Sequence, residues 1–118
     1  MTNQYTVVTP EIAARLEAIC GKNYVIYRDA ERLEPYSHDE IPGKHYRHLP
    51  EIVVRPQSTE EVAAVIKLAN EEHIAVAPRG AGSGLSGGAV PVYGGIVIAT
   101  DRMNKILELD KENMMVVV

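Results

Sequence analysis

The chain has 118 residues and a formal net charge of −4, and 46% of its residues are hydrophobic. This length is enough for one small domain. Because the chain is acidic overall and has no cluster of basic residues, nucleic acid is not expected as its main partner. Tyrosine is the only aromatic residue type, so the core is expected to be aliphatic.

The single cysteine, Cys20, has no partner in the chain for a disulfide bond, which favours a cytoplasmic location. It falls on the apolar face of an expected helix, where we interpret it as a buried core residue. The N-terminus lacks the basic and then apolar layout of a signal peptide. No apolar run approaches the roughly 20 residues that span a bilayer, so no transmembrane segment is expected.

Two short helices and a strand are expected near the N-terminus. Thr9 is a suitable N-cap for a helix over residues 10–20. A short strand is expected over residues 24–27, and Asp29 can cap the single helical turn that follows. Residues 36–50 are polar and contain three of the four histidines, so they are expected to form a loop.

The histidines of this loop raise the question of a metal site. His45 and His48 have the spacing of two ligands on one helical face. Pro42 and Pro50 make a helix unfavourable there. We therefore interpret the region, including His38, as a solvated loop and expect no metal site.

A strand–helix–strand unit is predicted next. Residues 52–54 form a short β-branched run. Ser58 and Glu61 have the spacing of a capping box, and apolar residues at helical spacing continue to about residue 72. A second short strand is expected over residues 74–77. A unit of this length is typical of a crossover between parallel strands.

The most informative segment is the glycine-rich run over residues 78–88, which directly follows this second strand. It contains five glycines and two serines. Glycine lets another molecule approach the main chain closely, and a row of unhindered N–H groups can form a nest for a phosphate. Ligands of parallel sheets lie beyond the carboxyl ends of the strands. The segment is therefore expected to hold a phosphorylated cofactor.

Residues 82–87 also match the pattern G-x-G-x-x-G of a Rossmann dinucleotide site. That site needs a helix to begin at the third glycine. Gly88 and Pro91 make such a helix unfavourable. Asp101 lies at the spacing of a ribose acceptor, although we interpret it as a turn residue after a strand. The Rossmann site remains the less favoured alternative.

Three further strands are expected over residues 95–99, 106–109 and 114–118. The last run is apolar and the chain stops inside it, and an exposed apolar strand promotes aggregation. We therefore expect the chain to be a piece of a longer polypeptide, with a natural C-terminal edge strand as the alternative. Met103, Met114 and Met115 are expected to be core residues.

Four segments together resemble the FAD-binding domain of the vanillyl-alcohol-oxidase and p-cresol-methylhydroxylase type, namely residues 54–62, 78–89, 95–98 and 103–107. Within this type the chain is similar to the flavin subunit of glycolate oxidase and to FAD-linked D-lactate dehydrogenases. The resemblance implies an α/β (α+β) fold, with a small parallel βαβ sheet, flanking helices and the start of an antiparallel subdomain at the C-terminus. Residues 1–50 would form an N-terminal helical and loop segment, and residues 51–118 a truncated first subdomain.

The resemblance also implies which residues hold the cofactor. In this family, backbone amides of the glycine loop bind the FAD pyrophosphate without a Rossmann helix. The positions that carry over to this role are Pro78, Arg79, Gly80, Ala81, Gly82, Ser83, Gly84, Leu85, Gly88 and Ala89. Arg79 can supply a positive charge or point outward. Some members attach FAD covalently through a histidine at the position of Ser83, so serine implies noncovalent FAD here.

For the whole protein, the family resemblance implies an FAD-linked dehydrogenase or oxidase that acts on a small 2-hydroxy acid, glycolate or D-lactate. The remainder of the same polypeptide would complete the cofactor site, and no residue of this chain is expected to be catalytic. Electrons would pass to an iron–sulfur subunit, an electron-transfer flavoprotein or a quinone. The location would be cytoplasmic, or peripheral at the inner membrane through partners. The alternative is a non-catalytic module that docks onto a separately encoded flavoprotein half.

Overall fold

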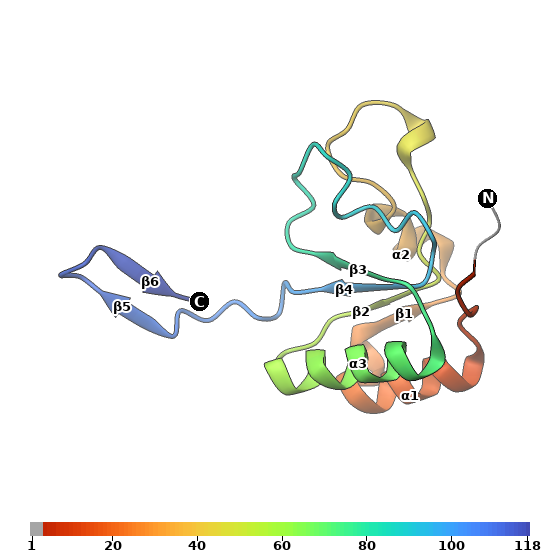
Figure 1. The fold of residues 1–118 in the computed structure, drawn as a ribbon, viewed down its shortest axis with the longest axis horizontal. Coiled ribbons are helices and arrows are strands. Elements are labelled where there is room, and N and C mark those ends of the chain that lie inside the picture. The colour runs from red at the N-terminus through yellow and green to blue at the C-terminus, as the bar shows by residue number, and fades with distance from the viewer. Residues whose placement is uncertain (1–3) are drawn as a thin grey trace.

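The computed structural model describes residues 4–118, and its centre is a four-stranded sheet (Figure 1). The strands are β1 (Val25–Tyr27), β2 (Ile52–Val54), β3 (Val76–Arg79) and β4 (Ile96–Ala99), in the spatial order β1-β2-β4-β3. Strand β1 is antiparallel to β2, whereas β2 and β3 both run parallel to β4. The expected parallel α/β fold with flanking helices is confirmed, but β4 lies between the two strands of the predicted crossover.

Two long helices, α1 (Pro10–Cys20) and α3 (Thr59–Glu72), cover one face of this sheet (Figure 1). Both begin as their N-caps predict. The Thr9 hydroxyl accepts a hydrogen bond from the Ile12 amide, and the Ser58 hydroxyl accepts one from the Glu61 amide. In return, the Glu61 carboxylate accepts a hydrogen bond from the main-chain amide of Gln57. In a standard capping box this donor would be the amide of the N-cap residue, Ser58.

The centre of the sheet is apolar on both faces because its two inner strands, β2 and β4, are continuous runs of buried aliphatic residues. Ile52, Val54, Ile96 and Ile98 pack against α1 and α3 in the larger core cluster. Val53 and Val97 face the opposite side, in a smaller cluster with Ala77 and Leu33. Leu33 belongs to the short helix α2 (Ala30–Leu33), which Asp29 caps as predicted. Cys20 is buried in the larger cluster, as expected.

Several predicted boundaries differ from those observed. Strand β3 begins two residues later than expected, and it includes Pro78 and Arg79. The loop over residues 36–50 contains a 3₁₀ turn, η3 (Lys44–Tyr46), and follows two others, η1 (Lys22–Tyr24) and η2 (Glu34–Tyr36). Pro78 can lie within β3 because β3 is an edge strand of the sheet, where proline is tolerated.

The last two strands, β5 (Glu108–Asp110) and β6 (Met115–Val117), form an antiparallel hairpin. Figure 1 shows this hairpin at the end of an extended linker, away from the sheet and its helices. The prediction that Met103, Met114 and Met115 are core residues is therefore wrong. Their exposed fractions are 39%, 93% and 57%, since the linker and the hairpin lie outside the core and the hairpin pairs with itself.

Candidate cofactor-binding site

The connection between β3 and β4 leaves the carboxyl end of β3 and returns to β4 through residues 80–95. It consists of bends and turns without a helix. Figure 1 shows it on the side of the sheet opposite α1 and α3, next to the loop over residues 36–50. The absence of a helix in this described connection excludes the Rossmann alternative, because that site needs a helix N-terminus for the pyrophosphate.

The main-chain N–H groups of this connection are the donors that an anion would use. Within residues 4–118, the N–H groups of residues 80–86 donate no hydrogen bond to another protein group. Gly80 and Gly88 are exposed, and a Cβ atom at either position would meet no heavy atom within 4 Å. The chemistry of this donor set fits a diphosphate, since charge-assisted N–H bonds to an anion are short and strong.

The structure places the expected site residues in one continuous stretch. Arg79, Gly82 and Ala89 are half-buried. The remaining expected residues are exposed, namely Pro78, Gly80, Ala81, Ser83, Gly84, Leu85 and Gly88. Most of the loop therefore presents an open face. Pro78 and Gly88 also line a pocket of about 140 Å³, which is smaller than the roughly 300 Å³ at which ligand pockets begin.

Arg79 turns toward the loop. Its Nη1 donates a 2.8 Å hydrogen bond to the carbonyl of His38, and the guanidinium lies 5.5 Å from the centre of the Tyr36 ring. Gly82 has a positive φ of 72°, and a Cβ atom there would overlap the same guanidinium. The positive charge therefore lies directly beside the glycine loop. Of the two predicted orientations of Arg79, toward the loop or outward, the structure has the one that favours an anion.

A second segment, residues 36–41, contacts the loop, although the sequence did not predict it as part of the site. Asp39 is only 6% exposed, and its Oδ2 accepts a 2.9 Å hydrogen bond from the Gly87 amide. The Glu40 amide donates to the carbonyl of Gly84 at 3.0 Å. No local pattern in the sequence predicts this contact, because 48 residues separate Asp39 from Gly87.

A separate charged cluster lies where β2 and β4 end. Asp101 accepts hydrogen bonds from Arg55, the shortest being 2.6 Å from Nη2 to Oδ2. These bonds hold the pKa of Asp101 below its ordinary value of 3.8. The Arg102 guanidinium lies 3.3 Å from the centre of the Tyr24 ring and donates to the carbonyl of Arg55. Asp101 is thus a turn residue after β4, as interpreted from the sequence, and not a ribose acceptor. Its ion pair with Arg55 joins the segment after β2 to the segment after β4.

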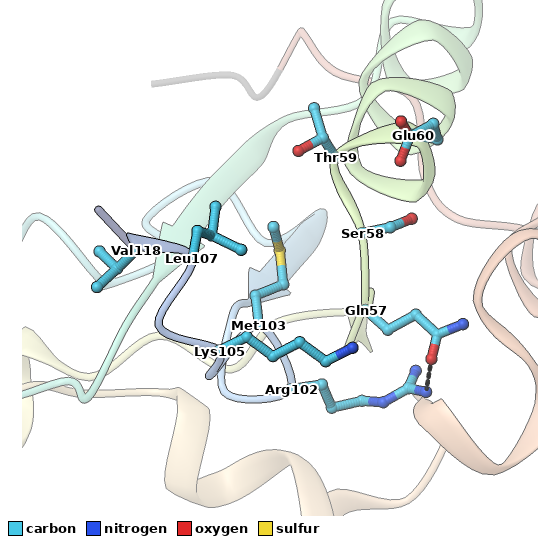
Figure 2. Close-up of a pocket in the computed structure, with 9 residues that line it drawn as sticks. All are labelled: Gln57, Ser58, Thr59, Glu60, Arg102, Met103, Lys105, Leu107 and Val118. Atoms are coloured by element: carbon cyan, nitrogen blue, oxygen red, sulfur yellow. Dashed lines mark hydrogen bonds between the residues drawn. The ribbon is translucent and has the colours of Figure 1, made fainter. Parts of the chain in front are cut away.

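A pocket of about 290 Å³ lies between the start of α3 and the linker to the hairpin (Figure 2). Arg102 spans part of it by donating from Nη2 to the side-chain oxygen of Gln57 at 3.0 Å. Its other lining residues are Ser58, Thr59, Glu60, Met103, Lys105, Leu107 and Val118. None of them belongs to the glycine loop, so this pocket is distinct from the candidate cofactor site.

The remaining chemistry-bearing side chains have structural contacts. The His45 ring packs 4.1 Å from the Tyr46 ring, and the His48 amide donates to the carbonyl of Ser37. Among residues 4–118, no three His, Cys, Asp or Glu side chains are grouped so that they could hold a metal ion. Burial and the charge of Glu61 raise the pKa of the Cys20 thiol to about 11, so this thiol stays protonated at neutral pH.

In the described part of the chain, no helix has both the length and the apolar character needed to cross a bilayer.

A family model for an FAD binding domain matches residues 50–118 of this chain. The chain belongs to this family. FAD is the cofactor of the domain, as the resemblance implied. The expectation of an FAD-binding domain of the p-cresol-methylhydroxylase type is confirmed by this match and by the structural neighbours below.

Curated relatives cover almost the whole chain. A D-lactate dehydrogenase of Anaerostipes hadrus is 45% identical over 96% of the chain and 23% of its own length. The glycolate oxidase subunit GlcD of Bacillus subtilis is 33% identical over 92% of the chain and 22% of its own length. The chain thus spans less than a quarter of the length of these relatives.

Solved structures share the fold. p-Cresol methylhydroxylase with bound substrate superposes with a TM-score of 0.74 at 28% identity, over 87% of this chain and 21% of that one. An alkyldihydroxyacetonephosphate synthase superposes with a TM-score of 0.79 over 98% of this chain and 23% of that one. Its identity is 23%, so it shows the fold alone.

Proposed function

We propose that this chain is the N-terminal part of a noncovalent FAD-dependent oxidoreductase that oxidises a small 2-hydroxy acid, glycolate or D-lactate, to the 2-oxo acid. The observation that carries the proposal is the row of N–H groups over residues 80–86 that form no hydrogen bond within the described protein, beside the Arg79 guanidinium. A diphosphate carries the charge and the acceptors that such a row binds.

The proposed cofactor contacts come from the expected loop residues. Main-chain N–H groups of residues 80–84 would hold the pyrophosphate beside the Arg79 side chain, and Gly88 and Ala89 would lie close to the cofactor. The hydroxyls of Ser83 and Ser86 can add donors. Ser83 cannot form the covalent flavin bond made by a histidine, which supports noncovalent binding. When bound, the isoalloxazine would supply the hydride chemistry, while this chain holds and orients one side of the cofactor.

The substrate proposal rests on the relatives named D-lactate dehydrogenase and glycolate oxidase subunit. We propose the remainder of the same polypeptide as the partner that completes the site. Most of the loop is exposed, and the chain spans only 23% of the length of the D-lactate dehydrogenase it matches. An iron–sulfur subunit, an electron-transfer flavoprotein or a quinone would accept the electrons. We propose a cytoplasmic location, or a peripheral one at the inner membrane through such partners.

The decisive experiment is a Gly82→Val substitution in the complete polypeptide that carries this chain. Valine at a φ of 72° strains the backbone, and its Cβ displaces the Arg79 guanidinium from the loop. We expect the flavin content of the purified protein, measured by its absorbance, to fall about tenfold or more. The far-UV circular dichroism should stay unchanged, because Gly82 lies outside the core.

Gly94→Ala is the matched control. Gly94 lies in the same connection with a similar φ of 71°, but its nearest neighbour is the Glu51 side chain and not Arg79. The Gly94→Ala protein should keep its flavin. Normal flavin content in the Gly82→Val protein would contradict the proposed pyrophosphate loop.

A second candidate function, a non-catalytic docking module, is favoured by the exposed hairpin. Val116, Val117 and Val118 are 48%, 48% and 85% exposed, so the edge of β6 can pair with a strand of another chain. The coding sequence after Val118 distinguishes the two. A continuous reading frame favours the longer enzyme, and a stop codon favours the module.

A further inference from the structure

The strongest feature outside the expected site is the buried carboxylate of Asp39. Each of its oxygens accepts a 2.9 Å hydrogen bond from a main-chain amide, Oδ1 from Ile41 and Oδ2 from Gly87. Such charge-assisted bonds are roughly twice as strong as neutral ones. The first bond shapes the segment around Asp39 itself, and the second attaches that segment to the glycine loop.

Three hydrogen bonds join this segment to the loop at its start, middle and end. Arg79 Nη1 donates to the carbonyl of His38, the Glu40 amide donates to the carbonyl of Gly84, and the Gly87 amide donates to Asp39. The last of these is the only one that ends on a carboxylate. Residues 38–40 thus hold the loop at three separate points.

These bonds leave the donors of the loop available. They use one carbonyl and one amide of the loop, at Gly84 and Gly87, whereas the N–H groups of residues 80–86 stay without a protein acceptor in the described chain. A glycine-rich loop has a large conformational entropy to lose when it becomes ordered around a ligand. A contact that orders it beforehand raises affinity by removing that cost from the binding step.

We infer that Asp39 is a positioning residue for the cofactor, holding the loop through Gly87 in the conformation whose N–H groups receive the diphosphate. This inference rests on the proposed function. It assigns to Asp39 no contact with FAD itself. Its role is to fix the end of the loop, while Arg79 supplies the positive charge at the start.

Glu51 provides a matched control in the same connection. Its Oε2 accepts the amide of Gly95 at 3.1 Å, just before β4 and away from the glycine-rich stretch. Asp39→Asn and Glu51→Gln each replace one carboxylate oxygen by an amide nitrogen. Both variants lose the negative charge and one acceptor oxygen beside a glycine amide, but only the first loses them at the cofactor loop.

The test measures FAD and riboflavin affinity of the complete polypeptide, stripped of flavin, by fluorescence titration. Asp39→Ala should weaken FAD binding about 10- to 100-fold, as expected for the loss of a bond to a charged group. Asp39→Asn, which keeps one acceptor oxygen, should restore part of the affinity. Glu51→Gln should bind FAD within about twofold of the unaltered protein. Affinity for riboflavin, which has no diphosphate, should not change in any variant.

Amide hydrogen exchange of the flavin-free protein gives a second readout. Gly87 should lose its protection in Asp39→Ala and part of it in Asp39→Asn, but keep it in Glu51→Gln. If Asp39→Ala does not fold, the isosteric Asp39→Asn variant carries the test. Unchanged FAD affinity in the Asp39 variants would overturn the inference, whether or not Gly87 stays protected. An unaltered protein that takes up no FAD would overturn the proposed function instead, and the exchange at Gly87 would still decide whether Asp39 holds the loop.

Discussion

At the residue scale, the pair of Arg55 and Asp101 carries a testable pH dependence. Hydrogen bonds from Arg55 lower the pKa of Asp101 from 3.8 in the folded protein. A carboxyl with a lower pKa in the folded than in the unfolded state stabilises the fold above its unfolded pKa, and this contribution is lost as the pH falls through the folded pKa. Because the Asp101 side chain is 49% exposed, solvent screening keeps the contribution small.

Asp101→Asn should therefore lower the free energy of unfolding by about 0.5 kcal/mol at neutral pH. The difference from the unaltered protein should shrink as the pH falls below 3.8. Urea denaturation at neutral pH and near pH 3 measures both values. Asp110→Asn, at the end of β5 in the hairpin, is the control and should not change the unfolding of the sheet. An equal loss at both pH values would show that the charge of Asp101 is not involved.

At the element scale, the hairpin of β5 and β6 is separable from the sheet. All residues of the two core clusters lie between Val8 and Ala99, so the hairpin contributes none of them. Its exposed apolar residues include Ile106, Leu107 and Leu109. An apolar hairpin of this kind promotes pairing between molecules.

Removal of residues 104–118 should leave the fold of the sheet intact, with a thermal midpoint within about 4 °C of the full chain. Self-association of the chain, measured by light scattering, should fall. Val116→Lys in the full chain should reduce association in the same way, because a charge on an edge strand opposes pairing. Loss of the helical circular dichroism signal after truncation would contradict this separation of hairpin and core.

At the scale of the whole molecule, the 118-residue chain should bind FAD weakly or not at all. Ligand sites bury roughly 70–90% of their ligand, whereas most residues of this loop are exposed. Isothermal titration of the chain with FAD measures the affinity, and the complete polypeptide should bind more tightly. Submicromolar binding by the 118-residue chain would show that one wall is enough to hold the cofactor.

Local signals in the sequence determined most of the elements and the position of the cofactor loop. Thr9, Asp29 and Ser58 each cap a helix through an amide three residues away, so a short window of sequence contains the whole interaction. The glycine-rich run after a strand predicted a main-chain anion site for a similar reason, since glycine acts on its own backbone. The sequence did not fix the boundaries of short strands. Strand β3 begins at Val76 and not at residue 74, because pairing with the neighbouring strand decides where it begins.

Only the tertiary structure decided which distant segments meet. Strand β4 pairs with both β2 and β3 and so lies between them, an order set by pairing between distant segments that no local pattern contains. The contact between Asp39 and Gly87 spans 48 residues and exists only because two loops cover the other face together. Caps and turns are determined within a few residues of chain, whereas the shape of the cofactor loop depends on packing across the sheet.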